Sequence, residues 1–357
     1  MRALMMPSFS RTLFPSDPSP GTAHFRLASS ARVLGRVHLG PGVHLAQGAV
    51  VCSPEGAVQL GAGSTLRENT TVVGTARHPV VVGEKTTLGP RGMVLGASVG
   101  HLCDVGAGAI LQPDARLGDR CLVADGALVP SGMWVPSDSV VVGRPARVVR
   151  RVDTGDLERL RASRGGSLTL PQQPLTPFFA RDRAEDAPMG QLYSLRDKHP
   201  LVHPTATLFS SAEVTGDVLI GPGAIIGPGV RIIGESHAPL RIGAGVRIHA
   251  NTVVQLQPGG TLVVEDGAII GPGCLVHGCF VGASTVVEAG AILCDRSRLG
   301  RGCLVGAGSM VRPGSLFPDA AQVDGFPAVQ TGFLSALPAT PPWALKPEDL
   351  PELRRVS

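Results

Sequence analysis

Aromatic side chains are scarce in this chain of 357 residues, which contains 10 Phe, 2 Trp and 1 Tyr. Charged residues make up only 17% of it, and the formal net charge is +4. Proteins that bind nucleic acid carry basic stripes interleaved with aromatic residues, and neither pattern occurs in this sequence. No uninterrupted apolar run reaches the roughly 18 residues that a membrane-spanning helix needs. The sequence therefore predicts neither a nucleic-acid-binding protein nor a transmembrane helix.

Paired cysteines are also missing, because the seven cysteines occur singly and none belongs to a Cys-x-x-Cys motif. The sequence shows no secretory signal ahead of them, so we expect free thiols in a reducing compartment. The first 21 residues contain Arg2, Arg11 and a single acid, Asp17. Such a segment is compatible with a mitochondrial presequence, which is rich in Arg and Ser and poor in acids, and equally with an uncleaved tail.

Glycine and proline are abundant, with 47 and 31 residues, alongside 43% hydrophobic residues. Disordered chains rich in Gly and Pro lack such aliphatic content. Aliphatic residues recur at every sixth position, a period that fits neither a helix nor the alternation of a single strand. The recurring residues are Val33, Leu39, Leu45 and Val51; Val99, Val105, Leu111, Leu117, Val123 and Val129; Val214, Ile220, Ile226 and Ile232; and Val281, Val287, Leu293, Leu299, Val305 and Val311.

A six-residue aliphatic period predicts a parallel β-helix built of hexapeptide repeats. Each hexapeptide forms one short strand and a corner, and three of them form a triangular coil of about 18 residues. The aliphatic side chain points into the prism, and small residues allow the chain to turn at the corners. The coils then stack at the strand spacing of about 4.8 Å. The expected fold class is therefore all-β.

The chain also repeats on a larger scale. Gly89-Pro90 matches Gly271-Pro272, and Leu111 matches Leu293, in each case 182 positions later. This repeat predicts a tandem duplication of one β-helix domain. The expected parts are an N-terminal extension at 1–21, a first β-helix domain at 22–151, a helix and Pro-rich linker at 152–201, a second β-helix domain at 202–330 and a C-terminal tail at 331–357.

A short helix or helical tail is expected after each β-helix. Asp153 or Thr154 caps the first helix, which ends at 164–166 in an Arg-Gly-Gly sequence. The second helical piece begins at Pro347. We expect both pieces to cover the open face or end of their own coil, and Trp343 to be a hydrophobic plug.

Two segments resemble gamma-class carbonic anhydrases. The stretch GPGCLVHGC at 271–279 is similar to the family segment that holds two zinc-binding histidines, although Pro272 replaces the first and only His277 remains. Residues 107–152, with their Gly-Arg-Pro-Ala-Arg ending, resemble the last coils and the following helix of these enzymes. The hexapeptide part is shared with acyltransferases and is specific for the fold only. The resemblance implies that the β-helices are left-handed.

Enzymes of this family bind zinc with three histidines, two from one subunit of a trimer and one from its neighbour. Carried over by the resemblance, the three ligand positions fall on Gln255, Pro272 and His277. The same positions in the first domain are Val73, Pro90 and Leu95, and none of these side chains can bind zinc. The resemblance therefore implies that the metal site has degenerated in both copies.

Three residues remain as vestigial metal-ligand candidates. Gln255 and His277 follow equivalent aliphatic residues one coil apart, so we expect their side chains to lie above each other on the outer face. His249 stands where the family has a residue that orients the zinc-bound hydroxide, and with Gln255 and His277 it forms a candidate for a rearranged site. Because supporting residues matter nearly as much as ligands, losing both favours abandoned catalysis. We predict no catalytic and no cofactor-binding residue.

Three functions remain open. The lost ligands favour a non-catalytic structural subunit of a trimeric β-helix assembly, whose partners are related β-helix subunits or further copies of this chain. In mitochondria, the resemblance implies the carbonic anhydrase-like module of complex I, on the matrix side and peripheral to the membrane; a cytoplasmic location is the alternative. The other functions are a zinc-dependent carbonic anhydrase with a rearranged site and a hexapeptide acyltransferase that deprotonates its acceptor with a histidine.

Overall fold

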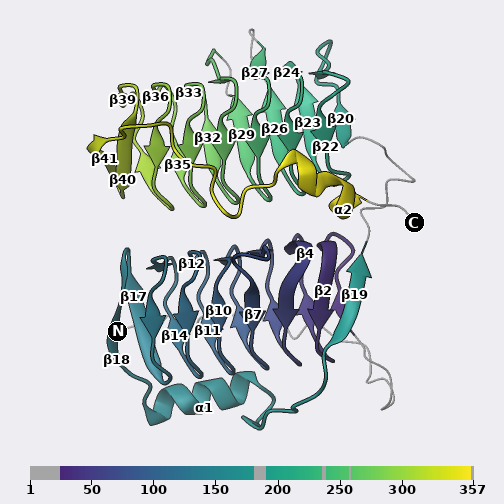
Figure 1. The fold of residues 1–357 in the computed structure, drawn as a ribbon, viewed down its shortest axis with the longest axis vertical. Helices are drawn as coiled ribbons and strands as arrows, with labels where there is room; N and C mark the ends of the chain where they lie inside the picture. Colours follow the sequence, from purple (N-terminus) through teal and green to yellow (C-terminus); the bar gives the residue numbers. More distant parts are fainter. Residues whose placement is uncertain (1–24, 181–189, 235–238, 257–258, 355–357) are drawn as a thin grey trace, which may run out of the picture.

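The computed structural model describes residues 25–180, 190–234, 239–256 and 259–354 (Figure 1). The N-terminal extension at 1–21 lies outside the described residues. The chain forms two tandem left-handed parallel β-helices, so the predicted fold class is confirmed. In the described part of the chain, no helix is both long enough and apolar enough to cross a membrane.

The first β-helix has three faces, two of which share long strands. One face consists of β1 (Arg26–Leu27), β3 (His44–Leu45), β5 (Thr65–Leu66), β8 (Thr87–Leu88), β11 (Asp104–Val105), β14 (Leu122–Val123), β17 (Ser139–Gly143) and β18 (Ala146–Arg151). The long strands β2 (Arg32–Leu39) and β4 (Val50–Leu60) contribute to both other faces. The second face continues with β6 (Thr71–Val73), β9 (Met93–Leu95), β12 (Ile110–Leu111) and β15 (Leu128–Val129). The third continues with β7 (Val80–Val82), β10 (Ser98–Val99), β13 (Arg116–Leu117) and β16 (Trp134–Val135).

The second β-helix has one sheet on each face. The first sheet holds β20 (Gln191–Tyr193), β23 (Glu213–Gly216), β26 (Arg231–Gly234), β29 (Val253–Leu256), β32 (Leu275–His277), β35 (Ile292–Leu293) and β38 (Met310–Val311). The second holds β21 (Leu201–Val202), β24 (Val218–Ile220), β27 (Leu240–Ile242), β30 (Val263–Val264), β33 (Phe280–Val281), β36 (Arg298–Leu299) and β39 (Leu316–Phe317). The third holds β22 (Thr207–Leu208), β25 (Ile225–Ile226), β28 (Arg247–Ile248), β31 (Ile269–Ile270), β34 (Val286–Val287), β37 (Leu304–Val305), β40 (Ala321–Gly325) and β41 (Ala328–Phe333).

The hexapeptide ladders form the interior of each prism. Leu111 and its counterpart Leu293 are both fully buried, and each prism has its own continuous aliphatic core. The corners between strands need left-handed backbone conformations, which asparagine tolerates better than most residues. Asn69 and Asn251 occupy equivalent corners of the two β-helices with φ of 56° and 58°. The repeat seen in the sequence is therefore also a repeat of backbone geometry.

Helix α1 (Thr154–Ser163) follows the first β-helix as predicted. The Asp153 side chain accepts a hydrogen bond from the backbone N–H of Asp156, and the Asp156 carboxylate accepts one from the backbone N–H of Asp153. This reciprocal arrangement satisfies two of the free donors at the helix start. The linker then contributes strand β19 (Thr176–Ala180), which pairs antiparallel with β2. No periodic pattern in the linker predicts that strand.

The C-terminal tail ends in η1 (Pro347–Asp349) and helix α2 (Leu350–Arg354), so a helical piece does begin at Pro347. The expectation that it covers its own coil is wrong, because α2 contacts β2 and β4 of the first β-helix. Leu353 is buried there in an apolar cluster that also contains Leu34 and Cys52. Helix α2 thus connects the tail of the second β-helix to the first.

The two β-helices lie side by side and run in the same direction, with the C-terminal segment between them (Figure 1). We call the contact between them the seam. Apolar residues from both prisms and from the C-terminal segment form a third buried cluster in the seam. Its members are Leu34, Cys52, Val73, Met93, Leu95, Ile110, Phe209, Ile225, Ile269, Val286, Ala289, Trp343, Ala344, Leu345 and Leu353.

Replacing one ladder residue tests the additive core. We expect Leu293→Ala to lower the free energy of unfolding by about 2–5 kcal/mol, because it removes buried methylenes and leaves a cavity. Leu111→Ala, the equivalent change in the first β-helix, has the same expected effect. The control Leu316→Ala removes a side chain that is 73% exposed and is expected to change the free energy by less than about 0.5 kcal/mol. Urea denaturation followed by circular dichroism measures all three.

Candidate functional site

The ligand positions carried over to the second β-helix lie on two adjacent strands and one corner. Gln255 on β29 and His277 on β32 are partners in the parallel register, so they do lie above each other on the outer face. Both are half-buried, and Pro272 is buried in the corner that follows β31. Zinc sites need at least three protein ligands. This chain supplies at most two possible metal ligands here, Gln255 and His277, so the site does not fit a complete zinc site.

The equivalent positions of the first β-helix lie in a different environment. Val73 and Leu95 are buried in the seam, in the same apolar cluster as Trp343 and Leu345, whereas Pro90 is exposed. Neither Val73 nor Leu95 has a side-chain atom that can bind a metal ion.

His249 does not join Gln255 and His277. It directly follows β28, which belongs to a different sheet from β29 and β32. Its ring makes an edge-to-face contact with Trp343, with the ring centroids 5.1 Å apart. Among the described residues, no group of three His, Cys, Asp or Glu side chains is close enough to hold a metal ion. The structure therefore does not bring the three vestigial candidates together.

The surroundings of His249 form a small buried polar cluster. The Trp343 indole Nε1–H donates a hydrogen bond of 2.9 Å to Oε2 of Glu288. Burial raises the pKa of Glu288, and the hydrogen bond from Trp343 opposes that shift. Burial, reinforced by the charge of Arg247, lowers the pKa of His249 to about 3, and its Nε2 has no hydrogen-bond partner among the described residues. His249 is therefore a neutral core imidazole at physiological pH.

The cysteines near the vestigial site are core residues. All seven cysteines of the chain are free thiols. Burial raises the pKa of Cys274 and of Cys279 to about 12. Only the thiolate is a good nucleophile or metal ligand. Neither side chain is thus suited to catalysis or to metal binding at neutral pH.

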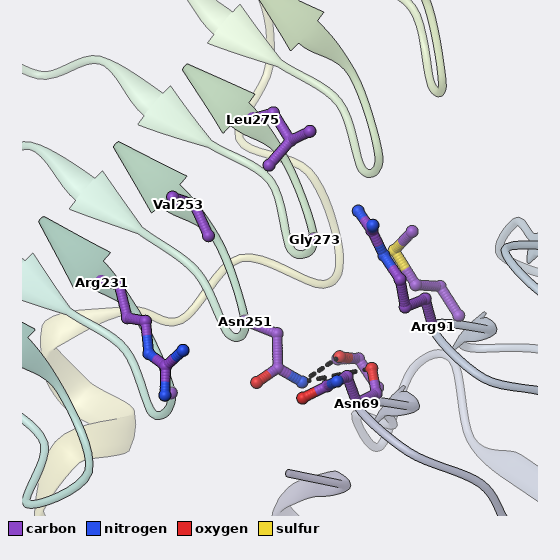
Figure 2. Close-up of a pocket in the computed structure, with 10 residues that line it drawn as sticks. Asn69, Arg91, Arg231, Asn251, Val253, Gly273 and Leu275 are labelled. Carbon is purple, nitrogen blue, oxygen red and sulfur yellow. Dashed lines mark hydrogen bonds between the residues drawn. The ribbon is translucent and has the colours of Figure 1, made fainter. Parts of the chain in front are cut away.

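A polar groove opens where the two β-helices meet, and it encloses about 250 Å³ (Figure 2). Asn251 lies in it and donates from Nδ2 to the carbonyl oxygens of Gly48 and Asn69, at 3.1 and 3.3 Å, and to Oγ1 of Thr71 at 3.1 Å. We call these three bonds the asparagine clasp. The complete lining is Asn69, Thr71, Arg91, Met93, Gly229, Arg231, Asn251, Val253, Gly273 and Leu275. The only trace of this groove in the sequence is the spacing of 182 positions between Asn69 and Asn251.

Comparisons with known proteins agree with the fold. The chain is similar to the mitochondrial gamma carbonic anhydrase 1 of Arabidopsis thaliana, with 31% identity over 132 residues, which is 35% of this chain and 48% of that protein. It is also 31% identical over 108 residues to the carnitine operon protein CaiE of Escherichia coli strain K12, covering 30% of this chain and 55% of CaiE. A hexapeptide transferase family protein from Anaplasma phagocytophilum aligns in structure with a TM-score of 0.38 and 27% identity, over 46% of this chain and 90% of that one.

The chain is thus similar to gamma carbonic anhydrase-like hexapeptide-repeat proteins. It spans about half the length of the curated relatives it matches. No family model matches it. In this gamma carbonic anhydrase-like chain, the positions that the resemblance matches to zinc ligands hold Val73, Leu95 and Pro90 in one β-helix and Gln255, His277 and Pro272 in the other.

The buried imidazole of this gamma carbonic anhydrase-like protein predicts a pH dependence of stability. The unfolded state takes up a proton on this imidazole near pH 6.5, whereas the folded state excludes the proton down to about pH 3. The titration of His249 therefore leaves the free energy of unfolding unchanged above pH 6.5 and lowers it as the pH falls from 6.5 towards 3. Glu288, whose pKa is raised, acts in the opposite direction. We therefore expect His249→Phe, which keeps the ring on Trp343, to remove the acid-side loss and to stabilise the fold by about 1 kcal/mol at pH 7.5.

Urea denaturation of both proteins between pH 4 and 8 measures this effect. Below pH 6.5, we expect the free energy of unfolding of His249→Phe to exceed that of the wild type by a margin that grows as the pH falls. The exposed His203→Gln serves as control for the removal of an imidazole elsewhere. A constant difference between wild type and His249→Phe at every pH would contradict the prediction.

Proposed function

We propose that this protein is a non-catalytic gamma carbonic anhydrase-like scaffold. The observation that carries the proposal is the filled seam, where Val73 and Leu95, at positions that the resemblance matches to zinc ligands, pack with Trp343 in one buried apolar cluster. The outer face of the second β-helix supports it as well, because Gln255 and His277 alone do not complete a zinc site. The vestigial residues therefore serve in packing and assembly rather than in the hydration of carbon dioxide.

The scaffold is proposed to act in a trimer-like assembly. Its two β-helices take the places of two subunits, and a related β-helix subunit takes the third. Support comes from the side-by-side arrangement of the prisms (Figure 1), since this places equivalent surfaces where neighbouring subunits of a ring would carry them.

The finer form of the proposal assigns the protein to the carbonic anhydrase-like module of mitochondrial complex I, on the matrix side. The similarity to a mitochondrial gamma carbonic anhydrase supports it. Similarity of comparable strength to the bacterial CaiE protein weighs against choosing the compartment from relatives alone. Fractionation of the native host's membranes would test this assignment, with recovery in the matrix-side arm of complex I as the expected result.

Two enzymatic functions are alternatives to the scaffold. A zinc-dependent carbonic anhydrase would require the partner subunit to supply a ligand beside Gln255 and His277. A hexapeptide acyltransferase would bind coenzyme A, and titration calorimetry with coenzyme A is expected to give no heat of binding. The buried, neutral His249 is not placed to deprotonate an acceptor, because its Nε2 lies inside the seam.

The scaffold proposal predicts an assembly that does not depend on metal. We expect the complex isolated at native expression level to contain related β-helix subunits and less than about 0.1 zinc per copy of this chain. Native mass spectrometry with elemental analysis of the same sample measures both quantities. Incubation with a chelator is expected to leave the mass unchanged, because apolar side chains pack the seam. One zinc per chain, lost together with the assembly on chelation, would refute the scaffold.

A further inference from the structure

The seam joins two different surfaces, and each β-helix uses only one of them. The first β-helix contributes the outer side of β6, β9 and β12, which we call face 1 and define by Thr71, Val73, Met93, Leu95 and Ile110. These five residues are buried. Besides Ile225, Ile269 and Val286 on the outer side of its third sheet, the second β-helix contributes a row of corners to the seam, which we call corner 2. It consists of His249, Ala250, Asn251, Pro272 and Ala289.

Contacts across the seam are close. A Cβ at Gly273 would lie 3.0 Å from Cε of Met93, and a Cβ at Gly290 would lie 2.8 Å from Cδ1 of Ile110. The asparagine clasp of Asn251 adds three hydrogen bonds at the edge of this packing. Corner 2 therefore fits face 1 both in shape and in hydrogen bonding.

Because of the duplication, each surface has an equivalent that the seam leaves unused. Corner 1, on the first β-helix, is made of Arg67, Glu68, Asn69, Pro90 and Ala107. All five are exposed, whereas the residues of corner 2 are buried or half-buried. Face 2, on the second β-helix, is made of Val253, Gln255, Leu275, His277 and Ile292. All five are half-buried, whereas those of face 1 are buried.

The side chain of Asn69 has the same geometry as that of Asn251 but donates no hydrogen bond to another β-helix in the described part of the chain. A Cβ on Gly48 would lie 2.2 Å from Oδ1 of Asn69, and one on Gly229 would lie 2.4 Å from Oδ1 of Asn251, so both amides point the same way from their coils. Asn251 clasps the first β-helix through Nδ2. The Asn69 amide donates to no residue that the structure describes. Corner 1 thus presents the donor of a second clasp to the outside.

Both unused surfaces border the same groove (Figure 2). Its lining includes four pairs of equivalent residues, namely Asn69 with Asn251, Thr71 with Val253, Arg91 with Gly273 and Met93 with Leu275. A groove lined by equivalent residues of both prisms lies around the axis that relates them. Contacts between unlike surfaces close into a ring when the rotation allows it. In such a ring, one further prism would contact corner 1 and face 2 together.

We propose that this groove is the docking site for one single-β-helix hexapeptide subunit, whose face receives Asn69 and whose corner covers Gln255 and His277. This inference rests on the proposed scaffold and names the surface that binds its partner. A second copy of this chain fits less well. It would place Leu275 against Arg91, where the seam has Gly273 against Met93, and it would bring two prisms where one closes the ring. The partner is inferred to carry a small or acidic residue opposite Arg91.

Site-specific photo-crosslinking in the full chain, produced in its native host, tests the docking site. A photo-crosslinking amino acid replaces Arg91 in one variant and His277 in another. A third variant carries it in place of Leu316, on a remote face where that side chain is 73% exposed. We expect the first two positions to react with the same polypeptide, one whose sequence contains hexapeptide repeats for a single β-helix, and position 316 to give no such product.

Several results would overturn the docking site. These are products with a second copy of this chain, products with a polypeptide lacking hexapeptide repeats, no product from positions 91 and 277, and a β-helix partner reached only from position 316. The last result would leave the scaffold proposal intact. Conversely, one zinc per chain together with the expected cross-links would refute the scaffold and leave the docking site.

The clasp itself is tested with Asn69→Asp, which tolerates the left-handed corner but cannot donate from its side chain. We expect this change to weaken binding of the purified cross-linking partner about tenfold without shifting the midpoint of unfolding. The control Arg116→Ala, at an exposed position of β13, is expected to leave the affinity unchanged. Equal affinities for wild type and Asn69→Asp would show that Asn69 forms no clasp.

Discussion

The structure depends on one inward-pointing aliphatic side chain per hexapeptide. A triangular prism has room for little else, so residues such as Leu111 and Leu293 fill the interior and their neighbours along each strand point outward. Each coil stacks on the next through main-chain hydrogen bonds, which do not depend on which side chain points outward. The outer faces are therefore freer to change than the interior, where equivalent positions such as Leu88 and Ile270 are both aliphatic.

Those differences follow from where each half stands in the pair. Leu95 and His277 occupy equivalent positions, yet the first is buried in the seam and the second is half-exposed. Pro90 and Pro272 show the opposite pattern, since the first is exposed and the second is buried. Joining two β-helices in one chain makes one contact permanent, and its buried side carries the aliphatic residues Val73 and Leu95. The outward face carries the polar residues Gln255 and His277 at the equivalent positions.

The repeating parts of the molecule could be predicted, because they leave a periodic signal. The ladders give the strands and the prism, and the Asp153 cap gives helix α1, since both depend on residues close in sequence. The pairing of β19 with β2, the contact of α2 with the other β-helix and the position of Trp343 over His249 could not be predicted. Each arises from a single non-repeated contact between distant segments, for which spacing carries no information.

The buried polar cluster shows which groups the C-terminal segment covers. His249 and Glu288 face the seam, where an uncovered imidazole and carboxylate would otherwise meet water or an ion. Trp343 covers both, giving an indole hydrogen bond to Glu288 and a ring face to His249, and Arg247 holds the segment by donating to the carbonyl oxygen of Leu345 at 3.3 Å. A single tail thereby closes the seam and leaves His249 neutral and unpaired at Nε2. Burying an unpaired imidazole nitrogen is unfavourable, and the packing of Trp343, Leu345 and Leu353 between the prisms offsets it.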